Sequence, residues 1–159
     1  MSNCAIILAG GEGKRMKSNL PKPMSEVLGK PMLRWVIDSV KSAGVDDICV
    51  VKGYKKECID EFVSSLPFEV ETVYQAERLG TGHAVMMAKD FLEKHSGNVV
   101  ILNGDAPFMD AKTISDALAL HTEKGSVATV ISAKVSDPTG YGRIVRDENN
   151  NFLKIVEQK

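Results

Sequence analysis

Apolar runs and segments with helical periodicity alternate along the chain almost without interruption. Short apolar runs between turn residues are typical of buried strands, and apolar positions three and four residues apart are typical of helices that cover a sheet. The pattern predicts strands at residues 4–9, 48–51, 70–74, 98–102 and 127–135. It predicts helices at residues 31–43, about 55–64, 81–94 and from Asp110 onwards.

Several turn and cap residues support these bounds. Pro31 suits a first helical turn, Gly44 suits a helix stop, and Asp110 is a plausible N-cap for the last helix. Residues 143–146 and 152–156 are two further apolar segments, and the polar stretch between them predicts a hairpin turn.

Strands that alternate with helices of this size imply βαβ units. We therefore expect an α/β, Rossmann-like fold with a mainly parallel sheet and helices on both faces. With no internal repeat, low-complexity tract or linker-like stretch, residues 1–159 are expected to belong to a single domain. The chain stops directly after an apolar strand without a closing helix, so we expect it to be truncated, part of a longer protein.

Composition narrows the class of partner. The hydrophobic fraction of 43% and the charged fraction of 26% are ordinary for a soluble globular protein. A net charge of −1 favours a small-molecule partner over nucleic acid or an anionic membrane. Cys4, Cys49 and Cys58 form no CxxC pair, which suits a reducing compartment. With no signal-peptide pattern and no apolar run long enough to cross a membrane, a cytoplasmic protein is expected.

The loop after the first strand carries the strongest candidate chemistry. Gly10, Gly11 and Gly13 would let backbone N–H groups approach an anion, and Lys14 and Arg15 would add positive charge. The spacing matches neither the P-loop nor the GxGxxG pattern. We interpret the loop as a phosphate cradle; the alternative is a flexible turn with solvated charges.

Two charged residues extend this candidate site. Lys22 stands between Pro21 and Pro23, which restrict the backbone and present its amine at a fixed place. Asp105 follows the predicted strand at 98–102, where a carboxylate could hold Mg²⁺ against phosphate oxygens. The alternatives are an ordinary surface lysine and a structural aspartate.

The stretch after the predicted strand at 70–74 could recognise a base. Gln75 could read a base edge with its amide, and Gly80 and Thr81 offer backbone and hydroxyl contacts. The alternative is a Thr81 N-cap with glycines that shape the turn. His83 is expected to point into the packing or towards a neighbouring carbonyl and not to act as a base. The absence of an HExxH motif, a Ser-His-Asp order or a nucleophilic cysteine setting argues against covalent catalysis.

Taken together, these stretches resemble the nucleotidyltransferase domain of sugar-nucleotide pyrophosphorylases. The resemblance is carried by residues 8–16, 20–22, 29–33, 75–84 and 104–105. Residues 75–84 and 137–145 narrow it to the family of bacterial bifunctional N-acetylglucosamine-1-phosphate uridylyltransferase/glucosamine-1-phosphate acetyltransferases, and residues 155–159 fit the same family. The implied fold is of the nucleotide-diphospho-sugar transferase type.

The resemblance implies transfer of uridylyl from UTP to N-acetylglucosamine 1-phosphate, with Mg²⁺ as cofactor and without a protein nucleophile. The products would be pyrophosphate and UDP-N-acetylglucosamine, a cell wall precursor. Carried over position by position, the nucleotide-binding residues would be Leu8, Gly10, Gly11, Gly13, Gln75, Gly80 and Thr81. Arg15 and Lys22 would be catalytic, Asp105 would bind Mg²⁺, and Gly142 and Glu157 would hold the sugar.

The chain also departs from this family. Gly10 stands where the uridylyltransferases usually carry Ala. In the family the domain continues past position 159 with an Asn that shares the metal and another Asn for the sugar, and a β-helix acetyltransferase domain makes full-length members trimeric; we expect this chain to lack all three. We therefore expect a monomer that binds nucleotide weakly and turns over slowly or not at all. Two alternatives stay open: a glucose- or mannose-1-phosphate nucleotidyltransferase, and a non-catalytic nucleotide-binding module.

Overall fold

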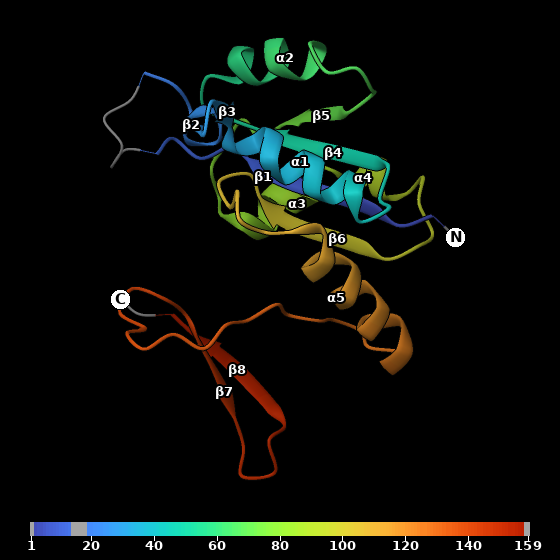
Figure 1. Cartoon of the computed structure of the whole chain (residues 1–159), viewed down its shortest axis with the longest axis vertical. Helices are drawn as coiled ribbons and strands as arrows, with labels where there is room; N and C mark the ends of the chain where they lie inside the picture. The colour runs from blue at the N-terminus through green and yellow to red at the C-terminus, as the bar shows by residue number, and fades with distance from the viewer. Residues whose placement is uncertain (1, 14–18, 158–159) are drawn as a thin grey trace. The chain divides into compact units, whose positions relative to one another are not determined.

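The structure is a computed structural model that describes residues 2–13 and 19–157. The chain divides into two compact units, residues 1–128 and residues 129–159 (Figure 1). The larger unit contains the parallel sheet and the candidate site, and the smaller one contains a hairpin.

Four parallel strands form the sheet of the larger unit, in the order β5-β4-β1-β6. Their bounds are Cys4–Ala9 for β1, Asp47–Lys52 for β4, Glu71–Tyr74 for β5 and Val99–Asn103 for β6. The strand β1 pairs along its whole length with β4 and along most of it with β6. The predicted parallel α/β fold is thereby confirmed.

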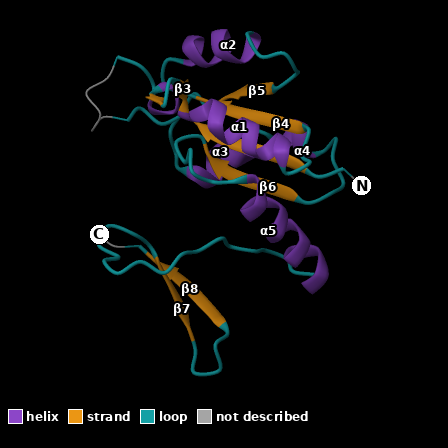
Figure 2. Cartoon of the chain, in the orientation of Figure 1, coloured by secondary structure: helices purple, strands orange, loops and turns teal. Residues whose placement is uncertain are grey.

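Helices cover both faces of this sheet (Figure 2). Their bounds are Met32–Ser42 for α1, Lys56–Ser64 for α2, Thr81–Met86 for α3, Lys89–Leu92 for α4 and Ala111–Lys124 for α5. The chain moves outwards from β1 to β4 and β5 through α1 and α2, and it then crosses back to β6 through α3 and α4. Because such crossovers are right-handed, the reversed direction puts α3 and α4 on the face opposite α1 and α2.

The apolar run of β1 explains the two-layered core. Ala5 and Ile7 pack in the cluster formed with α1, α2 and α5, whereas Cys4 and Ile6 pack in the cluster formed with α3 and α4. All four side chains are fully buried. A strand buried on both faces needs a continuous apolar sequence, because alternate side chains point to opposite faces.

A short hairpin lies between β1 and α1. Its strands are β2 (Glu26–Val27) and β3 (Lys30–Pro31), and it follows the one-turn helix η2 (Lys22–Met24). Trp35 of α1 donates a hydrogen bond of 2.9 Å from Nε1 to the carbonyl oxygen of Val27. This bond fastens the hairpin to the helix and so fixes the segment that leads out of Lys22.

An ion pair adds to this attachment. The Asp38 carboxylate of α1 accepts hydrogen bonds from Lys30 Nζ at 2.8 Å and Arg34 Nε at 2.7 Å. Burial opposes ionisation of Asp38, but the hydrogen bonds and charges of Lys30 and Arg34 outweigh burial and lower the pKa of this carboxyl.

The smaller unit is an antiparallel hairpin of β7 (Arg143–Arg146) and β8 (Phe152–Val156), as the sequence predicts. The Asp147 carboxylate organises its turn by accepting hydrogen bonds from the backbone N–H groups of Asn149 and Asn151 at 2.9 and 2.7 Å. Aspartate suits such a turn because its short side chain satisfies nearby backbone donors.

The structure corrects the secondary-structure prediction in two places. Residues 127–135 form no strand, because within the described ranges no other strand pairs with them, and the side chains of Val127 and Val130 are exposed. The helix expected at 81–94 is divided into α3 and α4: the N–H of Ala88 bonds to Val85 at 3.0 Å, which tightens the turn and interrupts the regular helix.

Within the part of the chain that the structure describes, no helix is long and apolar enough to cross a membrane.

The burial of the core predicts that thiols will differ in reactivity. Cys4 and Cys49 are fully buried, and burial raises the pKa of the Cys49 thiol to about 12, whereas Cys58 on α2 is only half-buried. Because the thiolate is the reactive form, iodoacetamide should modify Cys58 alone in the native protein and all three cysteines in denaturant. Mass spectrometry of the alkylated protein checks this. Rapid native modification of Cys4 or Cys49 would contradict the described core.

Candidate functional site

The carboxyl ends of β1, β5 and β6 open onto a hollow of about 310 Å³. Loops at this edge of a parallel sheet are where ligands bind in open α/β folds. The hollow brings together the predicted site residues Leu8, Gly10, Gly11, Gly13, Lys22, Gln75, Gly80, Thr81 and Asp105. These residues come from segments far apart in the sequence, so the fold is what assembles them.

Close backbone packing shapes one wall of the hollow. A Cβ atom on Gly53, which follows β4, would lie 2.7 Å from the carbonyl oxygen of Gly10. The same carbonyl accepts a hydrogen bond of 3.2 Å from the N–H of Tyr54. Gly53 was not predicted as a site residue from the sequence, although a glycine directly after a predicted strand indicates close backbone approach.

Gly13 has an equally specific role. Its φ of 65° lies in the left-handed region, and a Cβ atom there would lie 2.7 Å from Cβ of Lys22. Only glycine satisfies both conditions without strain. The glycine-rich loop can therefore lie directly against the lysine.

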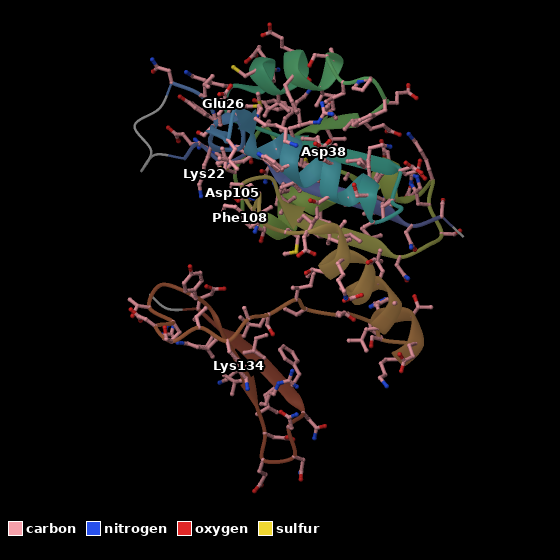
Figure 3. The ribbon with its side chains drawn as sticks, in the orientation of Figure 1. Lys22, Glu26, Asp38, Asp105, Phe108 and Lys134 are labelled. Carbon is pink, nitrogen blue, oxygen red and sulfur yellow. The ribbon has the colours of Figure 1, made fainter. Side chains whose placement is uncertain are left out.

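Lys22 and Asp105 meet in an ion pair at the hollow. Lys22 Nζ lies 2.6 Å from Asp105 Oδ2, and Figure 3 shows the two side chains beside each other. Their side chains are 41% and 32% exposed, so the pair contributes little to stability but is accessible to a ligand. The N–H of Gly104 bonds to the carbonyl of Leu8 at 2.9 Å, which continues the β1–β6 pairing up to Asp105.

Gln75 is the buried polar residue of this site, with 6% of its surface exposed. Its backbone N–H bonds to the carbonyl of Lys52 at 2.9 Å, which continues the β4–β5 pairing. Its Nε2 lies 3.2 Å from the carbonyl oxygen of Gly80 and 3.0 Å from His83 Nδ1. His83 was expected to point into the packing or towards a neighbouring carbonyl, and its ring contacts the Gln75 amide instead.

The region after β5 differs from the capping alternative considered for Thr81. Gly80, with a φ of 103°, occupies the N-cap position of α3, and Thr81 is the first helical residue. Arg78 in the preceding loop forms an ion pair of 2.7 Å with Glu12 of the glycine-rich loop. Sequence reasoning missed this contact because the two residues lie in loops of different strands.

The hollow contains one carboxylate suited to Mg²⁺. Among the described residues, no group of three or more His, Cys, Asp or Glu could hold a metal ion. Mg²⁺ usually takes one or two protein carboxylates and completes its shell with water and substrate phosphates. Asp105 fits that use, because it is partly exposed and lies beside the glycine-rich loop.

The remaining predicted site residues lie elsewhere. Arg15 is outside the described residues. Gly142 and Glu157 belong to the smaller unit, where a Cβ atom on Gly142 would lie 3.1 Å from Glu157 Oε1. The hairpin pairing of β7 and β8 therefore brings these two residues together, and their role in sugar binding stays a prediction.

Comparison with known proteins identifies the family of this chain. Residues 4–158 match the nucleotidyl transferase family model, and the chain belongs to the nucleotidyl transferase family.

The curated relatives are bifunctional GlmU proteins, which confirms the predicted resemblance. The chain is 46% identical over 154 residues to the one from Thermoanaerobacter pseudethanolicus, covering 97% of this chain and 33% of the relative. It is 48% identical over 159 residues to the one from Clostridium beijerinckii, covering 100% of this chain and 34% of the relative. The chain thus spans about a third of the length of these relatives.

A solved structure supports the fold alone. UDP-glucose pyrophosphorylase from Acinetobacter baumanii superimposes with a TM-score of 0.65 at 21% identity, covering 79% of this chain and 54% of that one.

The contact between Gly53 and Gly10 generates a stability prediction. Gly53→Ala should lower the free energy of unfolding by about 1–3 kcal/mol, because the new methyl group collides with backbone that cannot move aside. Gly82→Ala in α3 is the matched control: its Cβ would meet nothing within 4 Å, and it should be neutral or stabilising by up to about 1 kcal/mol. Urea unfolding measures both, and equal stabilities for the two variants would contradict the described packing.

Proposed function

We propose that this chain provides the nucleotide site of a sugar-1-phosphate nucleotidyltransferase that transfers uridylyl from UTP to N-acetylglucosamine 1-phosphate. The observation that carries the proposal is the Lys22–Asp105 ion pair beside a glycine-lined hollow. The similarity to bifunctional GlmU proteins over the whole chain supports the choice of reaction.

The geometry suits a reaction that needs no protein nucleophile. The phosphate oxygen of the sugar phosphate attacks the α-phosphorus of UTP, the bond to the β-phosphate oxygen breaks, and pyrophosphate leaves. Gly10, Gly11 and Gly13 let the backbone approach the phosphates closely. Positioning and charge stabilisation then supply the catalysis.

In this proposal Lys22 and Asp105 have different electrostatic roles. The Lys22 amine is close enough to Asp105 to share a ligand with it, so phosphate oxygens entering the hollow would draw the amine away from the carboxylate. Asp105 would then hold Mg²⁺, which neutralises charge on the triphosphate when bound. Arg15 would add a second positive charge on the phosphates.

The sugar contact is assigned to the smaller unit. The Glu157 carboxylate packs against Gly142, where a Cβ atom would lie only 3.1 Å from Glu157 Oε1, so the absence of a side chain at Gly142 lets the carboxylate take this position. A carboxylate that accepts from sugar hydroxyl or amide groups fits N-acetylglucosamine. We place this reaction in the cytoplasm, with a monomeric chain and small-molecule substrates; the three free cysteines suit that compartment.

The roles proposed for Lys22 and Asp105 predict that the binding of Mg²⁺ and the binding of UTP are coupled. In calorimetric titrations, Mg²⁺ should strengthen UTP binding to the wild-type chain, and Asp105→Asn should abolish that dependence. Without Mg²⁺, Asp105→Asn should bind UTP more tightly than wild type, because no carboxylate repels the phosphates or holds the Lys22 amine. Lys22→Ala should weaken binding about tenfold or more under both conditions.

The matched controls are Lys112→Ala and Asp116→Asn, an exposed Lys–Asp pair of 2.5 Å on α5. These variants should bind UTP as wild type does. The proposal fails if UTP affinity does not depend on Mg²⁺ and responds equally to both pairs of substitutions. A preference for dTTP or GTP in the same titrations would contradict the uridylyl assignment while leaving the phosphate site intact.

A further inference from the structure

The Gln75 side chain is held by two neighbours on the same side of its amide. Nε2 lies 3.2 Å from the carbonyl oxygen of Gly80 and 3.0 Å from His83 Nδ1. Only 6% of the surface of Gln75 is exposed. A buried amide with defined partners at one end presents its other end in a fixed orientation.

The donor and acceptor properties of the neighbours determine which end of the Gln75 amide is the NH₂ group and which is the oxygen. The carbonyl oxygen of Gly80 can only accept, so the amide group facing it must be the NH₂ group of Gln75. That NH₂ group can only donate, so His83 Nδ1 must accept with its lone pair. His83 is therefore the neutral tautomer that carries its proton on Nε2.

The amide oxygen is left for a ligand. Gln75 Oε1 lies beside Gly10, where a Cβ atom would approach it to 3.3 Å, and both residues line the hollow. Both amide hydrogens are already used by Gly80 and His83, so the group offers an incoming base an acceptor and no donor.

We propose that His83 is a positioning residue for base selection: together with the carbonyl of Gly80 it holds the Gln75 amide with its oxygen towards the base and so favours uracil over cytosine. This inference rests on the proposed uridylyl transfer. Uracil carries a hydrogen at ring N3 that Gln75 Oε1 can accept, whereas cytosine has a lone pair at N3 that would face the same oxygen. An unlocked amide could turn its NH₂ group towards that lone pair and would then accommodate cytosine.

The first test is spectroscopic and needs no nucleotide. Nitrogen-15 NMR of the imidazoles should show the His83 proton on Nε2, with Nδ1 coupled through a hydrogen bond to the Gln75 side-chain amide. A proton on Nδ1, or a Gln75 NH₂ group whose signals do not change in His83→Leu, would overturn the proposal.

The second test measures base selectivity by titrating UTP and CTP into each variant. His83→Leu removes the acceptor and should reduce the preference for UTP over CTP about three- to tenfold, the effect of one hydrogen bond. His83→Asn places an amide oxygen near the position of Nδ1 and should restore much of the preference. His121→Asn on α5, away from the hollow, is the matched control and should leave the preference unchanged.

The outcomes separate this inference from the function on which it rests. If wild type does not prefer UTP, the uridylyl assignment itself fails and the inference fails with it. If wild type prefers UTP and His83→Leu weakens UTP and CTP equally, only the inference is overturned, because His83 then has a purely structural role.

Discussion

The central strand β1 is hydrogen-bonded along both edges, to β4 on one side and β6 on the other, and its side chains are buried on both faces. The rest of the site depends on this position. The loop that leaves β1 must emerge between the carboxyl ends of β4 and β6, so it passes Gly53 on one side and Asp105 on the other. The pairing continues beyond the strands through the bonds of Gly104 to Leu8 and of Gln75 to Lys52. The residues that line the hollow therefore share one sheet edge.

Two kinds of interaction hold the site, and they suit different tasks. Backbone contacts at Gly10, Gly13 and Gly53 are steric and leave no freedom to adjust, which gives the hollow a fixed wall. The Lys22–Asp105 and Glu12–Arg78 ion pairs are partly exposed and can exchange partners at little cost. A charged ligand can thus enter without disturbing the fold, because it replaces ion pairs and leaves the backbone packing intact.

The sequence predicted most of the fold because the physics of its elements is local. The apolar run of residues 4–9 could only be a strand buried on both faces, and Asp110 caps α5 by accepting a hydrogen bond of 2.6 Å from the N–H of Thr113.

The strand prediction was wrong for residues 127–135. An apolar, β-branched run indicates a strand but does not show which sheet edge it would pair with. Residues that line the hollow were predicted to lie together because glycines and charges follow predicted strands. The contacts of His83 with Gln75 and of Glu12 with Arg78 were not predicted. Nothing in the local sequence around one residue of each pair indicates that it contacts the other.

Amide NMR during titration with UTP and Mg²⁺ would show whether the ends of β1, β5 and β6 form one nucleotide site, as we propose. If they do, the amide signals that move will be those of Gly10, Gly11, Gly13, Gln75, Gly80 and Asp105, all with the same dissociation constant. Shifts confined to α5 or to the β7–β8 hairpin, with these signals unmoved at saturating UTP, would contradict it.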